Sequence, residues 1–233
     1  MQASRAPMHR RVLRAAAPWL AMLLATRSMA TDLTIAVHDH AGQAVEQSIV
    51  ALYPHPARAL VAVPRMHIMD QVDKQFVPLL LAIRVGDQIS FPNSDNIRHH
   101  VYSFSPARTF QLPLYRGIPS APVSFAVAGK VVLGCNIHDR MSAHVYVLDT
   151  DLFALTAAGQ HTFSGVPPGD YELAVFHPRQ SDADDGLRHP LRVEQQPTQS
   201  VAVGIAVAQV QADENQGLSP LELKFQELRR GSP

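Results

Sequence analysis

The sequence predicts an all-β protein built from two Greek-key-type β-sandwiches, with one short helix at the C-terminus. Two observations predict this fold class. The apolar stretches are short, rich in β-branched residues and bounded by Gly, Pro and Asn turn signals, which is typical of strands. Between the two ends of the chain, almost no segment shows the 3.6-residue period of an amphipathic helix.

The first thirty residues, 1–30, have the pattern of a secretory signal peptide. Arginines precede an apolar run from Ala15 to Ala25, and the small residues Ser28 and Ala30 follow it. We expect cleavage after Ala30 and export to the periplasm. No later apolar stretch reaches the roughly 20 residues that a membrane-spanning helix needs, so no transmembrane segment is expected after cleavage. Lys and Arg number 20, as do Asp and Glu, and this balance gives no reason to expect a nucleic-acid partner.

Strand candidates follow one another along the body of the chain. The first two, 33–39 and 47–54, lie on either side of an Ala-Gly-Gln turn, and segment 76–95 holds two more around Gly86 and Asp87. Further candidates are 99–104, 123–127, 130–134, 143–149, 161–166, 170–178, 191–195 and 200–207. A Pro-Pro-Gly-Asp turn signal separates the candidates at 161–166 and 170–178, so we expect these two to form a hairpin.

A helix is predicted only near the C-terminus. Ser219, Pro220 and Glu222 have the order of a capping box with proline at the first helical position. One face of the helix would carry Leu218, Leu221, Phe225 and Leu228. Two destinations stay open for this face, a sheet of the same chain or a partner.

The segment 157–178 also carries a family resemblance. Its pattern G-x-x-x-F-x-G-V-P-P-G-D-Y resembles the carboxypeptidase-regulatory or transthyretin-like family of small sandwiches, and segment 33–54 resembles that family's first strands. These halves stand far apart in the chain. The resemblance therefore implies a split transthyretin-like domain, 31–58 and 150–210, with a second domain, 59–149, inserted in it and 211–233 as a tail. Two sandwiches in series are the alternative.

Cys135 is the only cysteine in the chain. Exported proteins pair their structural cysteines, so a single one is a buried bystander, an intermolecular link, or a reactive or metal-bound thiolate. His138 and Met141 follow at steps of three residues, on one short loop between the candidates 130–134 and 143–149. Thiolate, imidazole and thioether together suit copper, whereas zinc rarely takes a thioether. A blue copper site needs one more histidine, and His99 and His100 are both available.

The segments 91–104 and 133–144 together resemble the cupredoxin family, most of all its amicyanin and plastocyanin members, over roughly residues 65–149. In that family an Asn precedes the first ligand His by six positions, as Asn93 precedes His99. The resemblance implies one mononuclear type 1 copper held by His99, Cys135, His138 and Met141. His100 stands where the family usually has Asn, which leaves the choice between His99 and His100 open. The two segments also resemble exported bacterial proteins labelled as methylamine-utilisation proteins.

Such a ligand set implies a carrier of single electrons between redox partner proteins. With four protein ligands no position is left for a substrate, so we expect no enzyme. Cys135 would be the main electronic route, His99 the buried imidazole, His138 the ring edge presented to a partner, and Met141 the ligand that tunes the potential. One alternative is a periplasmic copper-binding or copper-delivery protein without redox cycling, and another is a structural module that holds no metal. The sequence identifies neither the redox partner nor the oligomeric state.

Overall fold

The computed structural model describes residues 30–58, 63–119, 121–181 and 185–208, and these residues form strands and no helix. The expected all-β fold class is thereby confirmed. Most of the expected signal peptide and the whole of the expected helix around 218–228 lie outside the described residues. Within the described ranges, no helix is long and apolar enough to cross a membrane.

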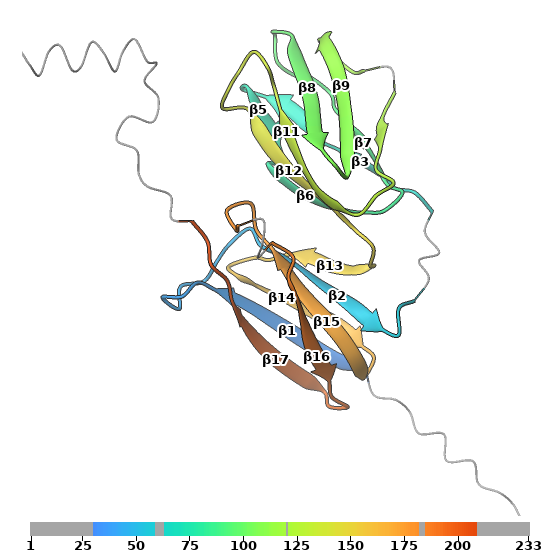
Figure 1. The fold of residues 1–233 in the computed structure, drawn as a ribbon, viewed down its shortest axis with the longest axis vertical. Coiled ribbons are helices and arrows are strands. Elements are labelled where there is room, and N and C mark those ends of the chain that lie inside the picture. Colours follow the sequence, from blue (N-terminus) through green and yellow to red (C-terminus); the bar gives the residue numbers. More distant parts are fainter. Residues whose placement is uncertain (1–29, 59–62, 120, 182–184, 209–233) are drawn as a thin grey trace, which may run out of the picture.

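One sandwich, called the lower sandwich after its position in Figure 1, combines the first two strands with the last five. Its first sheet has the order β14-β1-β17, and its second has the order β13-β2-β15-β16. The bounds are β1 (Thr31–His38), β2 (Ile49–His55), β13 (Leu152–Leu155), β14 (Gln160–Val166), β15 (Gly169–Phe176), β16 (Arg188–Val193) and β17 (Thr198–Gly204). The core between the sheets is mostly aliphatic and includes Leu33, Ile35, Leu52, Leu173 and Val193.

The other sandwich, the upper sandwich, is formed by the strands between β2 and β13 (Figure 1). Its main sheet has the order β6-β12-β11-β8-β9, and shorter pieces, β10-β7-β3 and β4-β5, complete it. The bounds are β3 (Met66–Ile68), β4 (Asp70–Val72), β5 (Gln75–Val77), β6 (Leu80–Arg84), β7 (Gln88–Ser90), β8 (His99–Ser105), β9 (Arg108–Tyr115), β10 (Val123–Ser124), β11 (Gly129–Gly134) and β12 (Ser142–Leu148). Its core includes Phe76, Ile89, Phe91, Phe125 and Val145, and also Cys135 and Met141.

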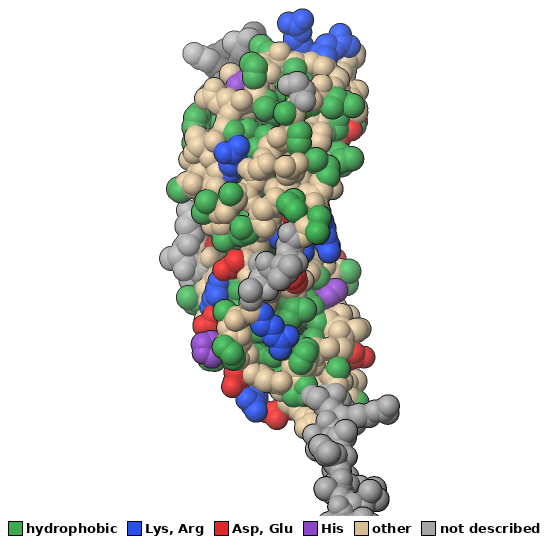
Figure 2. All heavy atoms as spheres, turned by 90° about the vertical axis from the view of Figure 1, so that its right-hand side faces the viewer, with side chains coloured by type: hydrophobic (Ala, Val, Ile, Leu, Met, Phe, Trp, Pro, Cys, Tyr) green, Lys and Arg blue, Asp and Glu red, His purple; other side chains and the backbone are tan. Residues whose placement is uncertain are grey.

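The two sandwiches share a hydrophobic junction. It is built from β2 and β15 on the lower side and from β6 and β12 on the upper side, and it contains Ile49, Ala51, Tyr53, Leu80, Tyr146, Leu148 and Ala174. The chain leaves the lower sandwich at β2 and returns at β13, and these strands pair with each other. Figure 2 shows one face of the molecule, on which charged side chains are more frequent over the lower sandwich than over the upper one.

Every strand candidate from the sequence coincides with a strand, but the pairing expected within 157–178 was wrong. β14 pairs with β1, whereas β15 pairs with β2 and β16, so the two strands belong to opposite sheets. The Pro-Pro-Gly-Asp turn therefore crosses the sandwich instead of closing a hairpin. Tyr171 supports this crossing, because its hydroxyl donates a hydrogen bond to the Pro167 carbonyl at 2.9 Å.

A titratable group, His177, lies directly after β15. The His177 side chain is buried, and its Nδ1 accepts a hydrogen bond from the Arg179 amide at 3.1 Å. Burial, and to a lesser degree the nearby Arg179, lower the pKa of His177 to about 4. The folded protein therefore holds this imidazole neutral, in a form that can accept the hydrogen bond.

We expect the metal-free protein to lose stability as the pH falls from 7 to 5. The folded pKa of His177 lies below its unfolded value, so the stabilisation is complete above about pH 6.5 and is lost as the pH approaches 4. The loss attributable to this residue should be about 1 kcal/mol at pH 5, allowing for solvent screening. Urea unfolding at both pH values measures it. His177→Asn keeps an acceptor for Arg179 and should show a smaller difference, and an equal difference in both proteins would contradict the assignment.

Candidate metal centre

Cys135, His138 and Met141 occupy the loop that joins β11 to β12. Three backbone hydrogen bonds close this loop: Cys135 N to Met141 O at 3.2 Å, His138 N to Cys135 O at 3.4 Å, and Met141 N to His138 O at 2.9 Å. Directly before the loop, Gly134 pairs with Ser142 across the β11–β12 ladder. The three residues are therefore fixed at the end of a two-stranded ladder, as the sequence predicted.

A close approach of β8 brings His99 to this loop. Gly134 pairs with Tyr102 of β8, and a Cβ atom at Gly134 would lie 2.7 Å from Cζ of the Tyr102 ring. Only glycine allows the ring to lie this near the backbone that precedes Cys135. β8 begins at His99, whose side chain is fully buried.

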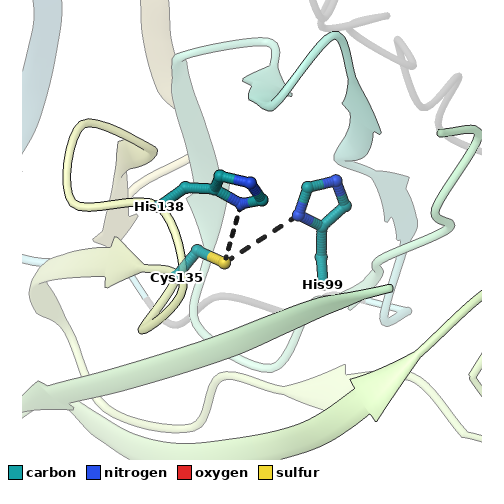
Figure 3. Close-up of side chains that lie close together, drawn as sticks. All are labelled: His99, Cys135 and His138. Carbon is teal, nitrogen blue, oxygen red and sulfur yellow. Dashed lines mark hydrogen bonds between the residues drawn. The ribbon is translucent and has the colours of Figure 1, made fainter. Parts of the chain in front are cut away.

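The donor atoms of His99, Cys135 and His138 converge on one point (Figure 3). Cys135 Sγ lies 3.9 Å from His99 Nδ1 and 3.8 Å from His138 Nδ1. The two imidazole rings are 4.9 Å apart between centroids. All three ligand atoms lie within 4.8 Å of one another, and no other cluster of three such residues occurs in the described part of the chain.

These distances fit a single metal ion. Bonds of about 2.0 Å to nitrogen and about 2.3 Å to sulfur, meeting at about 120°, separate nitrogen and sulfur by about 3.7 Å. The two observed separations, 3.9 and 3.8 Å, are close to this value. One soft thiolate and two imidazoles form a donor set that suits copper and also zinc. Both sulfur–nitrogen separations are therefore compatible with one metal ion held between the three side chains.

His100 does not join the cluster. Successive side chains of a strand point to opposite faces, so the ring of His100 leaves β8 on the side away from His99. It packs against Tyr102, with ring centroids 5.5 Å apart, and Tyr102 in turn packs against Phe104. The structure thus places His99, and not His100, beside Cys135.

Met141 is brought to the same loop, but its role as a ligand stays a prediction. Its side chain is buried in the core that also contains Cys135. Its backbone accepts the hydrogen bond from the Cys135 amide described above. These contacts place Met141 next to the cluster and leave the sulfur–metal bond as an expectation.

Asp95 is a partner of the cluster that the sequence analysis missed. Its Oδ2 accepts a hydrogen bond from His99 Nε2 at 2.6 Å, which leaves Nδ1 facing the Cys135 sulfur. A carboxylate that orients a ligand histidine in this way is common in metal sites. An acidic residue four positions before His99 was the available signal.

Asn93 braces the loop that carries Asp95 and leads to His99. Its side-chain amide donates to the carbonyls of Ile97 at 2.9 Å and Tyr115 at 2.8 Å. Its Oδ1 accepts a hydrogen bond from the Asp95 amide at 3.0 Å. The Asn expected six positions before the ligand therefore fixes the shape of this loop.

The electrostatic surroundings favour neutral imidazole and charged carboxylate. Burial lowers the pKa of His138, and the neighbouring His99 and Lys74 lower it further. Burial alone would raise the pKa of Asp95, but hydrogen bonds from the Lys74 amide, His99 and the Asp73 amide outweigh it and lower this pKa. At neutral pH His138 is thus ready to bind a metal, since a metal takes imidazole in its deprotonated form.

A cleft of about 1130 Å³ lies beside the β11–β12 loop, between the two sandwiches. The upper sandwich contributes Lys74, Arg140 and Met141 to its wall, and the lower sandwich contributes Glu46 and His177. The β11–β12 loop itself carries Ile137, which is half exposed and directly precedes His138. The cluster is buried on the side of Cys135 and His99 and approaches the surface at His138.

No family model and no curated protein matches this sequence. Solved structures with a similar fold over part of the chain include an amicyanin variant in its reduced state, with 21% identity over 35% of this chain and 81% of that chain at a TM-score of 0.32. A purple cupredoxin from Nitrosopumilus maritimus matches with 20% identity over 36% of this chain and 98% of that chain, at a TM-score of 0.31. A copper-containing nitrite reductase from Thermus scotoductus matches with 23% identity over 51% of this chain and 28% of that chain, at a TM-score of 0.35. Because each TM-score lies below 0.5, these likenesses do not indicate what the chain does.

Proposed function

We propose that this protein carries single electrons through one mononuclear type 1 copper held by His99, Cys135, His138 and Met141. The observation that carries the proposal is the convergence of one cysteine sulfur and two imidazole nitrogens at separations that suit a single ion. A methionine buried on the same loop supplies the weak fourth ligand of such a site. Copper is favoured over zinc because zinc rarely takes a thioether.

The protein's own residues would support electron transfer by holding the ligands still. When bound, copper supplies the Cu(I)/Cu(II) couple. The β11–β12 ladder and the backbone hydrogen bonds of the loop fix Cys135 and Met141, while the contact with Asp95 fixes His99. A ligand set that moves little on a change of oxidation state needs little reorganisation. His99 and Cys135 are shielded from water, so His138 is the ligand through which electrons would pass to a partner.

We place this carrier in the periplasm, after removal of residues 1–30, with a redox protein as partner. The upper sandwich, within 59–149, would be the copper domain. The lower sandwich, 31–58 with 150–210, would be the split transthyretin-like domain that supports it. A carrier is proposed in preference to an enzyme, since the four ligands would occupy the positions that a substrate needs. Copper delivery without redox cycling is the alternative that the experiments below distinguish.

Addition of Cu(II) to the metal-free protein should produce an intense absorption band toward the red end of the visible spectrum. Cys135→Ser should abolish this band completely, because the charge-transfer transition needs the thiolate. Ser142→Ala, a change at the first residue of β12, should keep the absorption band. A colourless wild-type protein that passes Cu(I) to an acceptor would support delivery instead of electron transfer.

The matched pair His99→Gln and His100→Gln tests which histidine binds the metal. Only the imidazole of His99 faces Cys135, so His99→Gln should lose the coloured site and His100→Gln should retain it. Absorption and electron paramagnetic resonance spectra of the copper-loaded proteins measure this. The reverse outcome would exclude the proposed ligand set.

Met141→Leu should keep the colour and change the reduction potential. Leucine has a similar volume, so the core around Cys135 should stay packed. Loss of the thioether removes the weak ligand that tunes the site. Cyclic voltammetry measures the potential, and an unchanged value would show that the Met141 sulfur does not bind the metal.

A further inference from the structure

The turn between β4 and β5 has an unusual backbone. Its two central residues, Asp73 and Lys74, have φ angles of +52° and +60°, and neither is glycine. The turn closes a two-residue hairpin in which Val72 pairs with Gln75. Hairpin turns with two positive φ angles normally use Asn-Gly or Asp-Gly, because other side chains are strained in this conformation. A strained turn that persists is held by its surroundings.

The surroundings in this case are the carboxylate of Asp95. Asp95 Oδ1 accepts a hydrogen bond from the Asp73 amide at 2.7 Å, and Oδ2 accepts one from the Lys74 amide at 2.9 Å. Oδ2 also accepts a hydrogen bond from His99 Nε2 at 2.6 Å. The positive φ angles turn two successive amides toward one anion, as in backbone nests that bind anions. The Asp95 side chain is only 13% exposed, so water competes little for these contacts.

β8 alone does not fix the position of His99. The β8–β9 register shifts between His99 and Val101, so the ladder is irregular where the ligand begins. The ring of His99 needs another support, and among the described residues its hydrogen-bond partners are Asp95 and Cys135.

We propose that the Asp73–Lys74 turn and Asp95 form a clamp that holds His99 as the Nε2–H tautomer, with its Nδ1 lone pair directed at the metal position. The consequence for electron transfer rests on the proposed function. An anionic partner makes the imidazole a stronger donor, which stabilises Cu(II) more than Cu(I). The clamp therefore sets the reduction potential from a hairpin that contributes no ligand. Asp95 is a positioning residue in this scheme.

The first test uses the metal-free protein and is independent of copper. Nitrogen-15 chemical shifts of His99 report its tautomer. The wild-type protein should show the Nε2–H form, and Asp95→Ala should shift the ring toward a mixture of tautomers. A wild-type ring protonated at Nδ1, or a tautomer that Asp95→Ala leaves unchanged, would overturn the clamp.

The second test measures the copper-loaded protein. Asp95→Ala should weaken Cu(II) binding by about 10- to 100-fold, the usual effect of losing such a partner. If Cu(I) binding is unchanged, each tenfold loss raises the one-electron potential by about 59 mV. Asp95→Asn, which keeps most of the side-chain volume, should change the potential in the same direction and protects the test against a folding defect in the alanine variant.

Asp70→Asn is the matched control. Asp70 lies beside the same loop and accepts hydrogen bonds from the Ser94 amide and hydroxyl, whereas the carboxylate that binds His99 is that of Asp95. Its substitution removes the same charge. It should leave the His99 tautomer unchanged and should change the reduction potential very little. Equal potential shifts in the Asp70 and Asp95 variants would show that only charge matters and would overturn the clamp. A protein with the expected tautomer but no coloured copper site would instead contradict the proposed function.

Discussion

The candidate site of the upper sandwich depends on one constraint, the placing of the Cys135 sulfur near two imidazole nitrogens. The three donor groups come from two separate segments, the start of β8 and the β11–β12 loop, and lie at the edge of a core of Phe, Ile and Val side chains. Buried polar groups cost free energy unless they are satisfied. His99 Nδ1 and Cys135 Sγ have only weak contacts with one another, at 3.9 Å. A bound ion would satisfy both, which is why the arrangement is understandable as a metal site.

The local parts of this arrangement could be predicted from the sequence. Cys135, His138 and Met141 lie within one loop, so their spacing alone brings them together. The flanking strands have clear β-branched patterns. To choose His99 over His100, one must know which face of β8 points into the core. The sequence obscures this because both faces carry large side chains. Val101 lies on one face, and Tyr102 and Phe104 lie on the other.

The rest depends on tertiary contacts that carry little sequence signal. The Asp73–Lys74 turn lacks the glycine that marks such hairpins, and β3, β4 and β5 have only three residues each, so none was expected. β9 contains Pro113 and lies at a sheet edge, where proline is tolerated. The Pro-Pro-Gly-Asp turn looked like a hairpin because a turn signal does not reveal which sheet receives the next strand.

The lower sandwich bears directly on the rigidity of the metal loop. β12, which follows the loop, is buried on both faces: Val145 and Val147 pack in the upper core, and Tyr146 and Leu148 pack in the junction. A single carboxylate of the lower sandwich, that of Asp185, contacts both strands. It accepts a hydrogen bond from the Tyr146 hydroxyl at 2.9 Å and forms an ion pair with Lys130 Nζ at 3.1 Å. Lys130 belongs to β11 and Tyr146 to β12, so both strands that enclose the loop are tied to the same point. Displacement of the ligand loop would therefore have to break contacts between the sandwiches as well as those within the upper one, and the second sandwich thus restrains the geometry of a site to which it contributes no ligand.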